Sequence, residues 1–158
     1  MEVYDRLYGV FQIEEPVLVE LLKSPSVLRL AKIDQTGLPE EFSFRGRFSR
    51  LEHSIGVMLI LRHLGASLEE QVAGLLHDVS HTAFSHIVDW VYRNHGTESL
   101  QDDRHRDFLR SSEIPATLSR YGYSADRMAD YHLFSLLEKP IPDLCADRVD
   151  YALRQMPE

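Results

Sequence analysis

The stretch that decides the fold is residues 49–65, which read SRLEHSIGVMLILRHLG. Its apolar residues recur with the 3.6-residue period of a helix. Gly65 lies where such a helix would end, because glycine tolerates the left-handed backbone found at helix C-termini. The stretch therefore predicts one helix over residues 49–64, and this helix carries His53.

Similar patterns continue on both sides of this helix. Pro16 and Ser24-Pro25 each open a short helical segment. Ser67, with Glu70 three residues on, predicts a capping box for a helix that runs to His77-Asp78. Four more helices are predicted at 83–93, 103–112, 125–138 and 142–155, and two short strands of a hairpin at 8–13 and 41–45. We therefore expect an all-α fold, a helical bundle with a short N-terminal β-hairpin.

Length and composition narrow the class of protein. A chain of 158 residues with 44% hydrophobic content predicts a single domain over 1–158. The one cysteine, Cys145, excludes an internal disulfide and a multi-cysteine zinc site. Met1 opens no apolar leader and no apolar run reaches membrane-spanning length, so we expect a cytoplasmic protein without a membrane partner. The net charge of −8 argues against an extended nucleic-acid surface and leaves a small anionic substrate.

Histidines are concentrated in one part of the chain. Of the 8 histidines, five lie between residues 77 and 105. His77 and His81 would share one face if they lay in a helix, and Asp78 can direct a carboxylate toward an ion that His77 binds. Imidazole nitrogen and carboxylate oxygen suit one divalent metal ion such as Mn, Fe, Mg, Ni or Zn, which can activate water. The cluster therefore predicts a metal-dependent hydrolase.

Three ordered motifs surround these residues: RLEHSIG at 50–56, LLHDVSHTAFSH at 75–86 and ADRVDY at 146–151. They resemble the motifs of the HD-domain superfamily of metal-dependent phosphohydrolases, and within it those of the deoxynucleoside triphosphate triphosphohydrolase branch. The likeness covers residues 7–155. It implies hydrolysis of a dNTP to a deoxynucleoside and tripolyphosphate, a homo-oligomeric assembly, and a chain shorter at its C-terminus than its longer relatives.

The resemblance also implies roles for individual residues. The metal ligands would be His53, His77, Asp78 and Asp147. The nucleotide substrate would be contacted by Arg50, His86, Gln35 and Tyr151. Asp78 would also act in catalysis, and either His81 or His105 would protonate the leaving oxygen. Because Asp102 and Asp103 flank His105, we expect them to raise its pKa.

Two departures from the branch keep other functions open. Ser80 stands where the family usually has glycine, and Gln155 where the branch has an acid that binds the sugar. One alternative is a two-metal nucleotidase or phosphodiesterase whose second ion would be bound by His81, His86 and His105. The other is a regulatory protein that binds metal or nucleotide without turnover.

Overall fold

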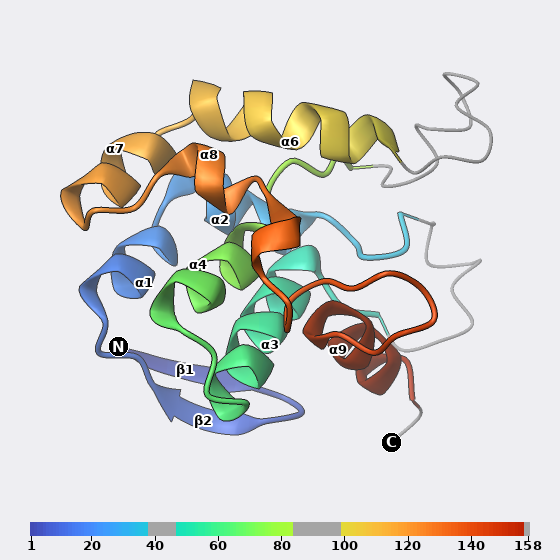
Figure 1. Ribbon diagram of the computed structural model, residues 1–158. Helices are drawn as coiled ribbons and strands as arrows, with labels where there is room; N and C mark the ends of the chain where they lie inside the picture. The colour runs from blue at the N-terminus through green and yellow to red at the C-terminus, as the bar shows by residue number, and fades with distance from the viewer. Residues whose placement is uncertain (38–46, 84–98, 157–158) are drawn as a thin grey trace.

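The computed structural model describes residues 1–37, 47–83 and 99–156. Helices make up most of these residues, and one two-stranded sheet lies near the N-terminus (Figure 1). In chain order the elements are β1 (Glu2–Asp5), β2 (Gly9–Gln12), α1 (Pro16–Leu21), α2 (Pro25–Leu28), the 3-10 helix η1 (Arg29–Lys32), α3 (Arg50–His63), α4 (Leu68–Leu76), α6 (Ser99–Ser111), α7 (Ile114–Arg120), α8 (Ala125–Met128), the 3-10 helix η3 (Tyr131–Leu133) and α9 (Ala146–Arg154). The predicted helical class with an N-terminal hairpin is confirmed.

The hairpin has a different first strand from the one predicted. β1 and β2 pair antiparallel, with Asp5 opposite Gly9. Gly9 has a φ of +86°, a backbone conformation that glycine adopts without steric cost. The strand predicted at 8–13 is therefore confirmed as β2, but its partner is β1. The partner predicted at 41–45 lies outside the described residues. Buried and exposed side chains alternate along β1, as in a strand with one buried face.

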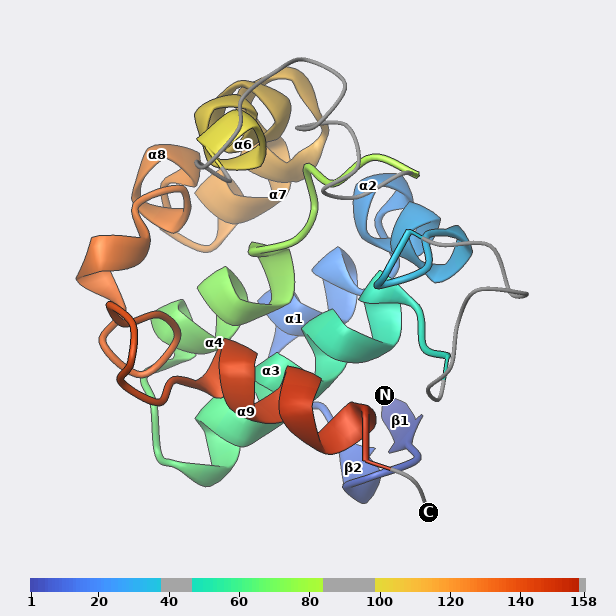
Figure 2. The same cartoon turned by 90° about the vertical axis from the view of Figure 1, so that its right-hand side faces the viewer.

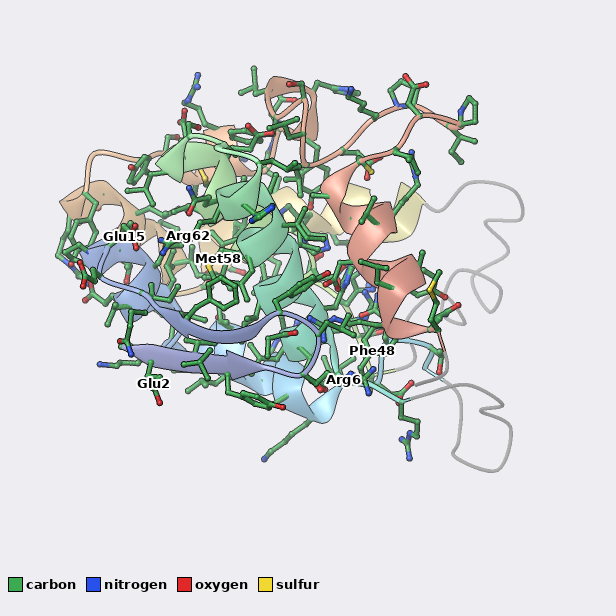
Figure 3. The ribbon with its side chains drawn as sticks, turned by 90° about the horizontal axis from the view of Figure 1, so that it is seen from below. Glu2, Arg6, Glu15, Phe48, Met58 and Arg62 are labelled. Atoms are coloured by element: carbon green, nitrogen blue, oxygen red, sulfur yellow. The ribbon has the colours of Figure 1, made fainter. Side chains whose placement is uncertain are left out.

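Helix α3 is the central element and forms where it was predicted. The Ser49 hydroxyl accepts the N–H of Glu52, and the Glu52 carboxylate accepts the N–H of Ser49, so the N-terminus has a complete capping box. At the other end Gly65 has a φ of +75°. α3 packs between α4 and α9 (Figure 1). Arg62 in its last turn pairs with Glu15, just before α1 (Figure 3).

Helix α4 is shorter than predicted and only half of its capping box forms. The Ser67 hydroxyl accepts the N–H of Glu70 at 3.1 Å. The Glu70 carboxylate instead accepts the N–H groups of Leu136 and Leu137, at 2.7 and 3.1 Å. The helix ends at Leu76, and residues 77–80 form a turn. His77 and Asp78, which follow the helix, therefore lie in a turn and not on a helical face.

The C-terminal half departs most from the predicted helices. α6 confirms the helix predicted at 103–112 but begins earlier, and α7 was not predicted. The helix predicted at 125–138 ends at Met128, and further along the chain the N–H groups of Leu136 and Leu137 donate to Glu70 of α4. The helix predicted at 142–155 begins only at Ala146. Residues 84–93 of another predicted helix lie outside the described residues.

The core has an apolar part and a charged part. The apolar part joins α1, α3, α4 and α7, and burial of these side chains provides the main stabilisation. Where α9 lies across α3 (Figure 2), the buried side chains are charged: Arg50, His53, Asp150 and Arg154. Among the described helices, none combines the length and apolar composition that crossing a membrane requires. These four buried side chains form a charged seam between α3 and α9.

Candidate metal centre

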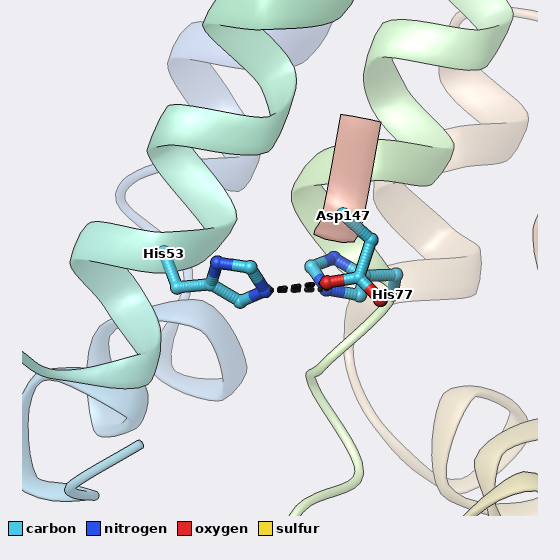
Figure 4. Close-up of side chains that lie close together, drawn as sticks. All are labelled: His53, His77 and Asp147. Atoms are coloured by element: carbon cyan, nitrogen blue, oxygen red, sulfur yellow. Dashed lines mark hydrogen bonds and ion pairs between the residues drawn. The ribbon is translucent and has the colours of Figure 1, made fainter. Parts of the chain in front are cut away.

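Three predicted metal ligands converge at this seam (Figure 4). His53 lies in the first turn of α3, His77 directly after α4, and Asp147 in the first turn of α9. His53 Nε2 lies 2.8 Å from Asp147 Oδ1 and 3.3 Å from His77 Nε2. One ligand atom from each residue lies within 4.8 Å of the other two. Three elements distant in sequence thus bring two nitrogens and one oxygen to a single point.

Asp78, the fourth predicted ligand, lies at the edge of this group. Its Oδ1 is 3.6 Å from His77 Nε2, and its Oδ2 is 4.0 Å from His53 Nε2. Both oxygens are also held by cationic or polar groups: Arg50 Nη1 donates to Oδ2 at 2.6 Å, and His81 Nε2 lies 3.1 Å from Oδ1. Asp78 therefore borders the three converging donors, and its carboxylate is also held by Arg50 and His81.

The two histidines are oriented as metal ligands commonly are. The ring nitrogen of His53 that faces away from the cluster, Nδ1, lies 2.7 Å from Asp150 Oδ2. Nδ1 of His77 lies 2.7 Å from the Gly74 carbonyl oxygen. A carboxylate and a carbonyl accept hydrogen bonds only, so each Nδ1 donates and each Nε2 can carry a lone pair. The two imidazole nitrogens suit Mn, Fe, Ni or Zn, and the carboxylate oxygen is a donor that Mg also accepts.

The protonation of the cluster depends on its opposite charges. Burial lowers the pKa of His53, but hydrogen bonds to Asp147 and Asp150 outweigh it and raise this pKa to about 9. The pKa of His77 is also raised, because Asp78 and Asp147 outweigh burial. The pKa values of the Asp78 and Asp147 carboxyls are lowered despite burial by the neighbouring cations and hydrogen bonds. The metal-free cluster therefore holds protons that a cation would displace.

The predicted substrate contacts lie in different surroundings. Arg50 is almost wholly buried, and its guanidinium binds Asp78 and also the backbone oxygen of Gln35 at 3.2 Å. Tyr151 is 38% exposed, and its ring packs edge-on near His53, with 6.4 Å between ring centroids. His86 lies outside the described residues. The structure thus brings Arg50 and Tyr151 next to the cluster, with Gln35 behind Arg50.

The predicted proton donors differ from each other. His81 is buried against Asp78, and because residues 77–80 form a turn, His77 and His81 do not share a helical face. His105 is 1% exposed, and its Nδ1 lies 3.2 Å from the Ser80 hydroxyl. Burial, with the nearby His77 charge, lowers the pKa of His105 to about 3. The expectation of a raised pKa is therefore wrong, because desolvation of the ring outweighs the nearby Asp78 charge.

One residue close to the centre received no role from the sequence. Asp150 has a fully buried carboxylate that contacts His53, although the ADRVDY motif includes it. Its spacing of three residues from Asp147 and four from Arg154 was the available signal, since both spacings fall on one side of a helix. That signal could not show which distant histidine the carboxylate meets.

Comparison with known proteins agrees with this geometry. Residues 50–154 match the HD domain family. The chain is 47% identical to the uncharacterized protein YdhJ of Bacillus subtilis over 99% of this chain and 48% of that protein. It is 43% identical to the metal-dependent phosphohydrolase cns2 of Cordyceps militaris, over 96% of this chain and 44% of that protein. The chain therefore spans about half the length of the curated relatives it matches.

More distant relatives and a solved structure extend the comparison. The chain is 29% identical to the deoxynucleoside triphosphate triphosphohydrolase SAMHD1 of Gallus gallus, over 77% of this chain and 24% of that protein. A crystal structure of a hypothetical protein from Aquifex aeolicus superposes with a TM-score of 0.74 at 25% identity, covering 98% of this chain and 45% of the other. The match over 50–154 spans every converging ligand, and the chain belongs to the HD domain family.

Proposed function

We propose that this chain is a phosphohydrolase that depends on one divalent metal ion held by His53, His77 and Asp147. The observation that carries the proposal is the convergence of these three donors, with both histidines oriented through Nδ1. The name of the relative cns2, a metal-dependent phosphohydrolase, supports the same class of reaction. Among the side chains that the structure describes, one such group of three donors converges.

The residues of the chain divide the work of hydrolysis between them. When bound, a divalent ion polarises a phosphoryl oxygen and lowers the pKa of water. Asp78 adds a second carboxylate beside Asp147, and Arg50 neutralises the charge of Asp78. Of the two predicted proton donors we favour His81, which lies against Asp78. His105, with a pKa of about 3, is neutral near pH 7 and suits hydrogen bonding better than proton donation.

For the substrate we propose a deoxynucleoside triphosphate, cleaved to a deoxynucleoside and tripolyphosphate. The name of the SAMHD1 relative supports this choice. Tyr151 supports it as well, because a partly exposed aromatic ring beside the metal ligand His53 can contact a sugar or base. Gln155, where the resembled branch has an acid, makes the preference for deoxyribose over ribose the first property to measure.

The test is hydrolysis of dNTPs, NTPs, dNMPs and cyclic dinucleotides, each with Mn, Mg, Ni or Zn, with products separated by ion chromatography. Tripolyphosphate from a dNTP is the expected product, and the His77→Ala variant should release none. Phosphate from a monophosphate or a diester would assign the chain to another reaction of the family. A protein that binds metal but forms no product with any substrate would support the regulatory alternative instead.

A further inference from the structure

A buried network of hydrogen-bonded side chains contacts Nδ1 of His53, the ring nitrogen that faces away from the candidate metal position. Asp150 is its first member and has no exposed surface. Its Oδ2 lies 2.7 Å from His53 Nδ1 and accepts a hydrogen bond from Arg154 Nε at 2.7 Å. Its Oδ1 accepts the Tyr8 hydroxyl at 2.8 Å. Three groups from three elements therefore fix one carboxylate.

This network of side chains ends at the N-terminal hairpin. Arg154 Nη2 donates to Asp5 Oδ2 at 2.6 Å, and both side chains are buried. Asp5 Oδ1 in turn accepts the N–H groups of Leu7 and Tyr8, at 2.8 and 3.2 Å, which closes the hairpin turn. The sheet lies beside the C-terminal end of α9 (Figure 2). The hairpin turn thus contacts the carboxylate of Asp150 directly through Tyr8 and indirectly through Arg154.

The side chains of Asp150 and Arg154 pack closely against the backbone of α3. Gly56 lies three residues after His53, and a Cβ atom at Gly56 would lie 2.0 Å from Asp150 Oδ1 and 2.2 Å from Arg154 Nη2. No real Cβ approaches other atoms so closely, so the side chains of α9 pack against bare helix backbone. Asp150 therefore cannot move closer to α3, and its hydrogen bonds to His53, Arg154 and Tyr8 hold it there.

We infer that Asp150 is a positioning residue for His53, and that the hairpin, through Tyr8 and Asp5, sets the affinity of the metal centre. A carboxylate can only accept a hydrogen bond, so it requires the proton of His53 on Nδ1 and leaves the Nε2 lone pair for the ion. Tyr8 remains a donor, because burial and the Asp150 charge raise its pKa. The inference rests on the metal site of the proposed function but not on its substrate.

The test compares two matched substitutions in the hairpin with one at Asp150. Tyr8→Phe removes one hydroxyl from the Asp150 carboxylate. Tyr4→Phe makes the same change on β1 at a side chain that is 74% exposed. Asp150→Asn removes the buried charge. For each variant we would measure the dissociation constant of Co²⁺ or Mn²⁺ alone by calorimetry, the visible spectrum of the Co²⁺ form, and the melting temperature of the metal-free protein.

Loss of an outer-shell partner typically weakens metal affinity by about 10–100-fold, and we expect Asp150→Asn to fall in that range. Tyr8→Phe should weaken binding several-fold and shift the Co²⁺ spectrum, whereas Tyr4→Phe should match the unmodified protein in both. These measurements are made on folded protein well below its melting temperature, so lower stability alone would not reproduce them.

The outcomes separate this inference from the proposed function. If the unmodified protein binds no divalent ion, the metal site and this inference both fail. If it binds the ion and Tyr8→Phe and Asp150→Asn bind equally tightly with unchanged Co²⁺ spectra, the positioning role fails while the metal site stands.

Discussion

Arg50 Nη1 lies 2.6 Å from Asp78 Oδ2, and the two side chains are only 1% and 7% exposed. A carboxylate and a guanidinium at this depth each depend on the other, because neither can regain its water without opening the fold. The sequence motif suggests that Arg50 meets substrate phosphate. Its position gives it a second task, which is to neutralise Asp78 beside the metal centre.

Arg50→Ala should therefore destabilise the protein. Removing one partner of a buried ion pair typically lowers the free energy of unfolding by roughly 3–5 kcal/mol, and we expect a loss of that order. Arg50→Lys keeps the charge without the planar geometry and should lose less. Urea unfolding of the metal-free variants measures both. A loss below about 1 kcal/mol for Arg50→Ala, the size of a surface pair, would mean that Asp78 finds another partner.

His77→Ala should abolish metal binding and hydrolysis together, because it removes one of three converging donors. The matched control is His63→Ala, which changes an exposed histidine at the end of α3. Metal bound per chain after dialysis, measured by mass spectrometry, checks the prediction. Retention of bound metal and full activity in His77→Ala would refute the assignment of this site. Asp78→Ala should lose activity as well, since its carboxylate borders the same position.

Stability of the metal-free protein should fall as the pH rises from 6.5 to 9. The pKa of His53 is about 9 in the folded protein and 6.5 ordinarily, so the folded state binds this proton more tightly. The resulting stabilisation is complete below pH 6.5 and disappears as the pH passes 9. His105 has the opposite effect and acts mainly below this window, because its folded ring is neutral while the unfolded ring takes up a proton as the pH falls through 6.5.

Melting temperatures at several pH values test this slope. His53→Gln should make the decline shallower but not remove it, because the pKa of His77 is also raised. Saturating metal should reverse the decline, because ligand histidines bind as neutral rings and metal affinity rises with pH. An equally steep decline in His53→Gln would assign the slope to other groups.

Gly56→Ala should disturb the metal centre from a distance. Its Cβ would displace the Asp150 and Arg154 side chains, and overpacking of this kind costs about 1–3 kcal/mol or more. Gly65→Ala is the matched control: its φ of +75° makes alanine costly by about 1–2 kcal/mol, but no atom lies within 4 Å of the new Cβ. Both variants should lose stability, and only Gly56→Ala should also lose metal affinity. Equal affinity in the two would show that the packing at Gly56 does not reach His53.

His81→Asn should slow hydrolysis more than His105→Asn. Loss of a general acid typically costs about 10²–10⁴-fold in rate, and the low pKa of His105 leaves that task to His81. The pH profiles of kcat/KM for the two variants decide the matter. A larger loss in His105→Asn, with loss of one limb of the profile, would reverse the assignment.

The parts of the fold that sequence predicted well depend on local chemistry. The N-terminus of α3 is encoded within four residues by Ser49 and Glu52, and its end by Gly65. The convergence of His53, His77 and Asp147 was implied by motif resemblance, which carries three-dimensional information that no single spacing contains. Individual roles at the site remain predictions.

The parts that sequence missed depend on contacts between distant residues. The helix pattern at 125–138 continues past Met128, where the helix ends, and it could not show that the N–H groups of Leu136 and Leu137 meet the Glu70 carboxylate of another helix. The sequence pattern predicts β2 but not its partner β1, because strand pairing depends on the geometry of the turn between the strands and on which face is buried. Asp150 was visible in a motif, but its function depends on a histidine 97 residues earlier in the chain.

The ion pair between Asp5 and Arg154 joins residues 149 positions apart. During synthesis, the hairpin and α3 emerge from the ribosome long before Arg154 is added. Until then the carboxylates of Asp147 and Asp150 cannot meet His53, so a nascent chain offers an incoming cation an incomplete set of donors. Metal acquisition by this fold therefore cannot precede the synthesis of α9, which supplies Asp147 and the partner of His53.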